Sequence, residues 1–147
     1  MDFPTSSLAG SARSGSAHRI EMQRIIAQAS IETHFQPIVS IKGQAIAGVE
    51  ALARGIHEFD GRLILPATLF RLAAAENLTA ELDAVCRRRA IENFAALYRR
   101  DPSLLLFLNF YTPALGASPF DDNLLSNQVC NTLEKHELPA HSVVLEV

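Results

Sequence analysis

The sequence has no long apolar run, no excess of basic residues and few cysteines. Its longest unbroken run of large apolar residues, Leu104–Leu108, is far below the ~20 residues that a membrane helix needs, and no apolar signal-peptide segment follows the start. The 13 basic and 16 acidic side chains give a net charge of −3, so the chain lacks the basic surface that binds duplex DNA or RNA. These absences predict a soluble, cytoplasmic protein without a membrane segment, in which any nucleotide ligand is small and held by a local site.

Motifs built on cysteine, histidine or glycine are missing as well. Cys86 and Cys130 lie far apart without metal-type spacing, which predicts buried free thiols in a reducing compartment, with a disulfide between them as the alternative. The five histidines show no HExxH spacing, and there is no Gly-rich phosphate loop, nucleophile elbow or CxxC pair. Zinc-protease, P-loop and α/β-hydrolase sites are therefore not indicated.

The sequence does have the composition of one packed domain. Of its 147 residues, 48% are apolar and 20% are charged, which is close to the usual globular balance. Residues 1–18 contain eleven Ser, Thr, Gly or Ala residues and too few large apolar side chains to offset the entropy of ordering, so we expect a flexible leader there. The folded domain is expected over residues 19–147.

Helical and extended patterns alternate along this domain. The apolar spacing predicts strands over 36–39, 44–54, 104–110 and 143–147, and helices over about 19–35, 66–77 and 79–99 and from Asp121 or Asp122 to Leu133. This alternation favours a parallel α/β architecture with the apolar 104–110 strand in its centre. Arg87–Arg89 are expected on the solvated face of the long helix. The last strand stops inside an apolar run, which is typical of an interrupted domain.

Three lone polar side chains interrupt the apolar strands: Glu50, Asn109 and Glu146. Each is near the carboxyl end of its expected strand, where parallel α/β folds place their sites. Burial of an ionised carboxylate is costly unless it is paired or bound to a cation, and carboxylate and amide oxygens are the ligands that Mg²⁺, Mn²⁺ and Ca²⁺ prefer. The three residues therefore predict one site for a hard cation.

A second group of residues accompanies Glu50. Leu52 and Arg54 follow it at alternate positions and project to the same side of the strand, and Gln36 is a polar, uncharged contact on the preceding strand. Because arginine grips phosphate oxygens with two parallel hydrogen bonds, a cation ligand beside a guanidinium indicates phosphate chemistry.

The same residues also have a structural interpretation. In it, Glu50 and Arg54 form an ion pair, Asn109 satisfies backbone groups at a turn, and Glu146 is exposed on an edge strand. From the residues alone, both interpretations stay open.

Six segments of the chain occur in the order of one known family. They are Phe35-Gln36-Pro37-Ile38-Val39, Glu50-Ala51-Leu52-Ala53-Arg54, Asp60-Gly61-Arg62, Pro66 through Glu76 to Asp83, Leu108-Asn109 and Leu145-Glu146. In this order and spacing the chain, from about Arg19 to Val147, resembles the EAL domain family of bacterial phosphodiesterases, which open cyclic di-GMP.

The resemblance implies a TIM-type (β/α)₈ barrel, of which the chain holds only the N-terminal portion, about three to four strands with their helices. The positions that match the family's metal ligands and its substrate contacts are, respectively, Glu50, Asn109 and Glu146, and Gln36, Leu52 and Arg54. In the family, two Mg²⁺ or Mn²⁺ ions activate a water that attacks a phosphodiester phosphorus of cyclic di-GMP and gives linear pGpG.

The chain departs from the family's pattern in two ways. Gly55 stands where the family commonly has an aromatic residue. A complete barrel of ~250 residues is also roughly twice as long as residues 19–147, and the family's later paired aspartates, its lysine and its further Glu and Gln contacts have no counterpart here. No complete catalytic set is present, so the resemblance implies a truncated phosphodiesterase that is inactive alone.

Two other hypotheses remain. One is a degenerate, non-catalytic EAL module that binds cyclic di-GMP or that joins a partner domain or a second copy through an open sheet edge. The other is an unrelated small α/β domain. Calorimetry with cyclic di-GMP and the oligomeric state distinguish a binding module from a phosphodiesterase fragment.

Overall fold

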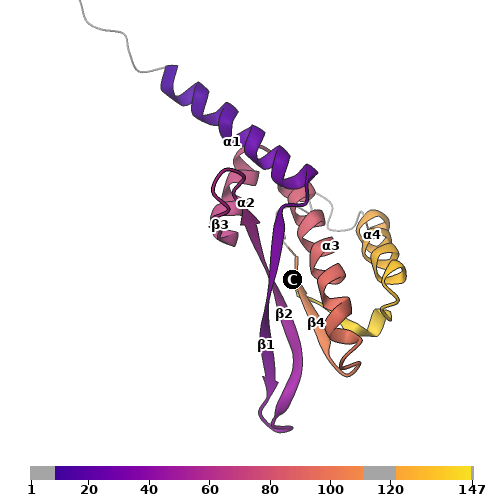
Figure 1. Cartoon of the computed structure of the whole chain (residues 1–147). Helices are drawn as coiled ribbons and strands as arrows, with labels where there is room; N and C mark the ends of the chain where they lie inside the picture. Colours follow the sequence, from indigo (N-terminus) through magenta and orange to yellow (C-terminus); the bar gives the residue numbers. More distant parts are fainter. Residues whose placement is uncertain (1–8, 111–121, 147) are drawn as a thin grey trace, which may run out of the picture.

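The computed structural model describes residues 9–110 and 122–146 of the chain. Its elements are α1 (Ala9–Ala27), β1 (Ile31–Ser40), β2 (Ala45–Ile56), β3 (Leu63–Ile64), α2 (Pro66–Ala75), α3 (Thr79–Tyr98), β4 (Leu105–Asn109), α4 (Asp122–Lys135), the short 3₁₀ helix η2 (Ala140–Ser142) and β5 (Val143–Glu146). Within these ranges, no helix combines the length and apolar character that crossing a membrane requires. Figure 1 shows α3 and α4 beside the sheet and α1 crossing one end of the hairpin of β1 and β2.

The five described strands form one sheet in the order β1-β2-β4-β5, with β3 paired to β2. β1 and β2 are antiparallel because the short turn over 41–44 joins them as a hairpin. β2 pairs with β4 and β4 with β5 in parallel, since helical crossovers connect these strands. The structure therefore confirms an α/β architecture with β4 in the centre, and it adds an antiparallel first strand.

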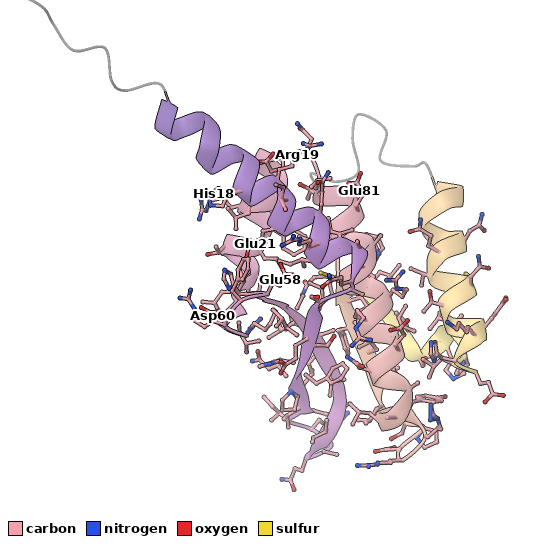
Figure 2. The ribbon with its side chains drawn as sticks, turned by 45° about the horizontal axis from the view of Figure 1, so that its top comes forward. His18, Arg19, Glu21, Glu58, Asp60 and Glu81 are labelled. Carbon is pink, nitrogen blue, oxygen red and sulfur yellow. The ribbon has the colours of Figure 1, made fainter. Side chains whose placement is uncertain are left out.

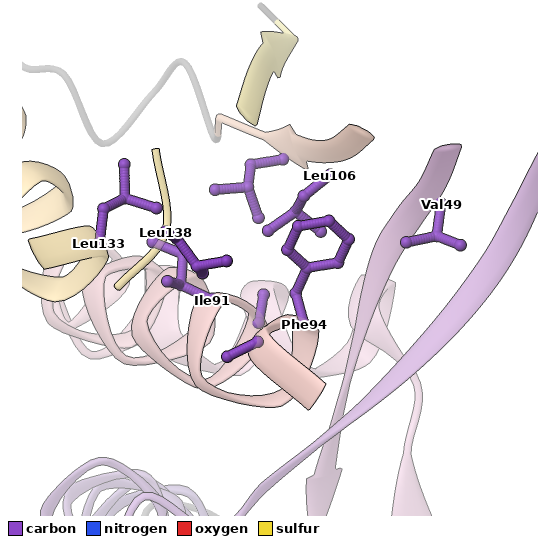
Figure 3. Close-up of a cluster of buried hydrophobic side chains, with 9 residues drawn as sticks. Val49, Ile91, Phe94, Leu106, Leu133 and Leu138 are labelled. Atoms are coloured by element: carbon purple, nitrogen blue, oxygen red, sulfur yellow. The ribbon is translucent and has the colours of Figure 1, made fainter. Parts of the chain in front are cut away.

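One face of the sheet is covered by α3 and α4. Val49 of β2 and Leu106 and Leu108 of β4 are at most 8% exposed and belong to one cluster with Ile91 and Phe94 of α3. Figure 3 shows this cluster between the sheet and α3, with Leu133 and Leu138 at the side of α4. Full burial of each such side chain contributes about 1.5–3 kcal/mol, so this cluster is a main source of stability.

A second buried cluster joins the C-terminal half of α1 to the domain. Met22 and Ile25 are 0% and 2% exposed and cluster with Leu69 of α2 and Leu82 of α3. Figure 2 shows α1 above the loop that carries Glu58 and Asp60. At this contact Arg24 forms an ion pair with Glu58, and the His57 ring lies 3.2 Å from Glu21 Oε1 and 2.8 Å from Asp60 Oδ1. This half of α1 is therefore an integral part of the domain.

α1 differs from the expected helix at both ends. It begins at Ala9, inside the stretch expected as a leader, and ends at Ala27, earlier than expected. At its C-terminus Ala29 has a positive φ of 49°, and the Ser30 N–H donates to the Ile25 carbonyl oxygen, as in a Schellman motif. Its small residues permit a helix that propagates from the docked end. Residues 1–8 of the expected leader lie outside the described residues.

The first strand begins at Ile31 rather than at Gln36. Ile31 and Phe35 pack toward the helices and Thr33 lies beside residues of α2 and α3, while Glu32 and His34 are exposed. The segment therefore has the two-residue period of a strand. Pro37 lies inside β1. Among the described strands β1 is paired with β2 alone, and proline within sheets is confined to such edge positions, because it has no N–H to donate to a second neighbour.

Two side chains lie in environments other than those expected. Cys130 of α4 is exposed, whereas Cys86 is buried, and both thiols are free, so the expectation of two buried thiols is wrong for Cys130. Arg87 is only 4% exposed, so its expected place on a solvated face is also wrong. α3 contacts α2 and α4 as well as the sheet, and it therefore buries more than one stripe of residues.

Candidate functional site

The face of the sheet opposite the helices carries the polar side chains singled out in the sequence. Along β2, Val49 and Ala51 pack toward the helices, so Glu50, Leu52 and Arg54 lie on the opposite face. We call this face the polar face. From β1, β2, β4 and β5 it includes Gln36, Glu50, Leu52, Arg54, Asn109 and Glu146.

Strand register brings the three expected cation ligands to one region of the polar face. Glu50 is paired with Phe107 of β4, so Asn109, two residues further along, lies on the same face. Asn109 is paired in turn with Glu146 of β5. The three side chains therefore come from three adjacent strands.

A hydrogen bond links two of these residues directly. The Asn109 Nδ2 donates to Glu50 Oε1 at 2.6 Å. Glu50 and Glu146 are half-buried and Asn109 is exposed. In the residue after Asn109, the Phe110 N–H donates to the Glu146 carbonyl oxygen at 2.9 Å. This bond holds the ends of β4 and β5 together.

The position of Glu50 along its strand differs from the expectation. Asn109 and Glu146 are the last residues of β4 and β5, but β2 continues for six residues beyond Glu50, to Ile56. β2 is longer because β1 and β3 pair with its second half. Glu50 therefore approaches the carboxyl end of β4 through strand register, and not because its own strand ends there.

The expected substrate contacts lie beside this group. Arg54 is half-buried, and its Nη1 donates to the Ala53 carbonyl oxygen at 2.9 Å. Leu52 is half-buried between Glu50 and Arg54, and Gln36 is exposed opposite Glu50 in the hairpin. Among the described residues no ion pair joins Glu50 to Arg54, so this part of the structural interpretation is not supported.

Two further polar residues on this face were missed in the sequence. Glu32 is paired with Arg54 and His34 with Leu52, and His34 Nε2 lies 2.8 Å from Glu32 Oε1. The sequence does contain a two-residue period here, because every second residue from Glu32 to Gln36 is polar. The helix expected over 19–35 included Glu32 and His34, so they were not assigned to a strand.

Gly55 faces the helices and not the polar face. A Cβ atom at Gly55 would lie 2.8 Å from Leu69 Cδ1 of α2. The chain's departure from the family pattern at this position therefore affects the contact between β2 and α2.

The donor atoms of the polar face suit a hard cation. Glu50 and Glu146 carry carboxylate oxygens, and the Asn109 Oδ1 takes no part in the hydrogen bond to Glu50. Oxygen ligands of this kind fit Mg²⁺, Mn²⁺ or Ca²⁺. In the described parts of the chain no three His, Cys, Asp or Glu side chains cluster closely enough to hold a metal ion, so a cation here needs the Asn109 amide as a further ligand.

Comparison with known proteins agrees with this architecture. Residues 19–147 match the family model of the EAL domain. The chain is 33% identical over 98 residues to the probable cyclic di-GMP phosphodiesterase PdeB of Escherichia coli K12, covering 67% of this chain and 18% of PdeB.

Solved structures share the fold. The PaMucR phosphodiesterase in complex with c-di-GMP superposes with a TM-score of 0.72 at 22% identity, over 89% of this chain and 51% of that one. The Bacillus subtilis YkuI protein, which has an EAL domain and was solved with c-di-GMP and calcium, gives a TM-score of 0.64 at 23% identity, over 86% of this chain and 30% of that one.

The chain thus spans about a fifth of PdeB and about half of the PaMucR structure. Its sheet and helices correspond to part of a TIM-type barrel. With the family model matched over residues 19–147, this chain belongs to the EAL domain family.

Proposed function

We propose that the chain carries the N-terminal part of a cyclic di-GMP phosphodiesterase site that yields pGpG. The observation that carries the proposal is the 2.6 Å hydrogen bond from Asn109 to Glu50, which joins two strands on the face that also bears Arg54. The probable activity of PdeB and the c-di-GMP complex of PaMucR support the same substrate.

In this proposal Glu50, Asn109 and Glu146 hold Mg²⁺ or Mn²⁺. The calcium in the YkuI complex supports a hard divalent cation in a relative. Such a cation, when bound, neutralises phosphate charge and lowers the pKa of a coordinated water. The hydrogen bond between Asn109 and Glu50 restrains both side chains before any ligand arrives, so less rotamer freedom is lost on binding.

Arg54, Leu52 and Gln36 bind the substrate in this proposal. The Arg54 Nη1 donates to a backbone carbonyl oxygen, and this bond holds the guanidinium in place while its other N–H groups donate to phosphate oxygens. Leu52 offers apolar surface beside the guanidinium, and the Gln36 amide offers both a donor and an acceptor.

The isolated chain is expected to be catalytically inactive. The residues that follow Glu146 in the family pattern, namely its paired aspartates and its lysine, have no counterpart among these 147 residues. A single set of ligands on one wall does not clamp both the attacking and the leaving oxygen.

Calorimetric titration of the 147-residue chain with Mn²⁺ tests the cation site. Glu50→Gln keeps the shape of the side chain but removes its charge, and it is expected to weaken Mn²⁺ binding by about tenfold or more. Glu32→Gln is the matched control, because it makes the same change on the polar face away from Asn109. Equal Mn²⁺ affinity in the parent chain and Glu50→Gln contradicts the proposal.

The parent chain and an Arg54→Ala variant test the substrate and the chemistry. Cyclic di-GMP is added with Mn²⁺, its binding is measured by calorimetry, and the products are separated by chromatography. We expect the parent chain to bind cyclic di-GMP, Arg54→Ala to bind it more weakly, and neither to produce pGpG. Robust pGpG production contradicts the expected inactivity of the isolated chain.

A second candidate function is binding without turnover, through partner association. Among the described strands, β5 is paired with β4 alone and has an open edge, and open edges are templates for strand addition. This function predicts that light scattering gives the mass of a dimer or of a complex with a partner. A monomeric chain without affinity for cyclic di-GMP contradicts it.

A further inference from the structure

A buried ion pair lies in α3, behind the polar face. Asp83 and Arg87 stand one helical turn apart, form an ion pair and are 5% and 4% exposed. Together with Ser142 they are the buried polar or charged residues in the part of the chain that the structure describes. Burial lowers the pKa of Arg87 to about 10, so its guanidinium is still charged at neutral pH.

Stability alone does not account for such a pair. Removal of both charges from water is costly, and replacement of a buried ion pair by apolar residues of similar volume often leaves stability unchanged or raises it. Such a pair can still hold the guanidinium in one position, and the guanidinium then restrains the side chain that it contacts.

The guanidinium contacts the residue that follows Asn109. The Arg87 Cζ lies 4.7 Å from the centroid of the Phe110 ring, within the range of a cation–π interaction. The Phe110 N–H donates to the Glu146 carbonyl oxygen at 2.9 Å. One residue therefore touches Arg87 with its ring and ties the end of β4 to the end of β5 with its backbone.

Packing beside this end of β4 is incomplete. A cavity of about 100 Å³ is bordered by Leu108 and Asn109 on the strand and by Asp83 and Arg87 on the helix. Among the described residues, neighbouring side chains do not fill the space next to Asn109, and unfilled space forfeits the contacts that hold its lining in place. Three contacts act on this strand end: the Phe110 ring with Arg87, the Phe110 N–H with the Glu146 carbonyl oxygen, and the Asn109 amide with Glu50.

We propose that Asp83 and Arg87 are positioning residues for the oxygen ligands Asn109 and Glu146. Asp83 holds the guanidinium, the guanidinium holds the Phe110 ring, and the ring holds the backbone from which both ligands project. The inference rests on the proposed function, because it assigns the pair to the same cation site. Neither residue touches the cation.

The test replaces the pair by apolar side chains of similar volume, Asp83→Leu together with Arg87→Met, in the full chain. Urea unfolding, the ¹H–¹⁵N shifts of the Asn109 side-chain amide and the Kd for Mn²⁺ are measured. We expect cooperative unfolding, an Asn109 amide shifted toward that of an asparagine that has lost its hydrogen bond to Glu50, and Mn²⁺ affinity lower by about 10–100-fold, as when outer partners of metal ligands are removed.

Val85→Ala is the matched control, because Val85 is buried on α3 between the two residues. It removes packing without touching the ion pair, and it is expected to lower stability while leaving the amide shifts and the Kd unchanged. A merely structural role of Asp83 and Arg87 predicts that the double variant behaves like this control.

Phe110→Leu tests the same contact from its other side, and it decides the matter if the double variant does not fold. It keeps the ion pair and removes the ring, so it is expected to shift the Asn109 amide in the same direction. Combined with Arg87→Met it is expected to add little, since both act through one contact.

Parent shifts of the Asn109 amide in both folded variants overturn the positioning role. A parent chain that binds no Mn²⁺ contradicts the proposed function instead. The amide shifts, which need no metal, then decide the positioning role by themselves.

Discussion

The two faces of the sheet are built from the same strands but hold their side chains differently. On the covered face Leu106 and Leu108 are 0% and 2% exposed and are fixed by close packing against α3. On the polar face Glu50 and Asn109 are fixed by one hydrogen bond and by strand register. One step along a strand therefore separates the residues that stabilise the fold from those that are available to a ligand.

Loss of a buried aromatic ring from the covered face should reduce stability the most. Phe94 is fully buried, and its ring centroid lies 6.5 Å from that of Phe35 and 5.9 Å from that of Tyr98. Phe94→Ala is expected to lower the free energy of unfolding by about 3–5 kcal/mol, measured by urea denaturation. Phe59→Ala is the control, since Phe59 is 83% exposed. Similar losses of unfolding free energy in Phe94→Ala and Phe59→Ala would contradict the conclusion that packing on the covered face stabilises the fold.

The polar face also contains a tight contact, at Gly48. A Cβ atom at Gly48 would lie 2.5 Å from the Leu105 carbonyl oxygen and 2.8 Å from Phe107 Cε2. The backbone of the neighbouring strand cannot move away cheaply, so Gly48→Ala is expected to cost about 1–3 kcal/mol in urea denaturation. Gly43→Ala in the exposed turn should change stability by less than about 0.5 kcal/mol. Equal losses of stability in Gly48→Ala and Gly43→Ala would contradict the tight contact at Gly48.

A smaller effect is expected from the hydrogen bond itself. Asn109→Ala removes the donor to Glu50 at an exposed position, and a hydrogen bond of this kind contributes about 1 kcal/mol or less. Urea denaturation should show this small loss, while calorimetry should show a much larger loss of Mn²⁺ affinity. A stability loss as large as that of Phe94→Ala would mean that the polar face is part of the core.

The smallest effect concerns reactivity and leaves stability unchanged. Burial raises the pKa of the Cys86 thiol to about 12, so at pH 8 almost none of it is the reactive thiolate, while Cys130 is exposed on α4. Titration of the native chain with a thiol reagent should detect one cysteine, and Cys130→Ser should abolish the signal until denaturant is added. Rapid modification of the Cys130→Ser variant would contradict the burial of Cys86.

Much of the fold was accessible from local pattern. The helix that begins at Pro66, the long helix from Thr79 and the central strand ending at Asn109 were each expected within a few residues of their observed bounds, because apolar period and end signals are local properties. The grouping of Glu50 with Asn109 was also expected, since polar residues in apolar strands are costly without a partner.

What local pattern missed depends on neighbours far away in the chain. Ile31–Phe35 has apolar residues compatible with a helix, and pairing with β2 makes it a strand. Arg87 has the sequence surroundings of an exposed residue, and it is buried because α2, α4 and the sheet all contact its helix. Tertiary contacts override propensity in both cases.

Local pattern and residue type are enough to establish the family pattern, the alternation that separates Glu50 and Arg54 from their apolar neighbours, and the chemistry of the oxygen donors. Three further features required the folded chain: Glu50 bonds to Asn109 from the middle of its strand, Gly55 faces α2, and Arg87 lies against Phe110. The reason is physical: residue type and period act over one turn or one strand, whereas register and helix docking are fixed by the packing of segments that are distant in the chain.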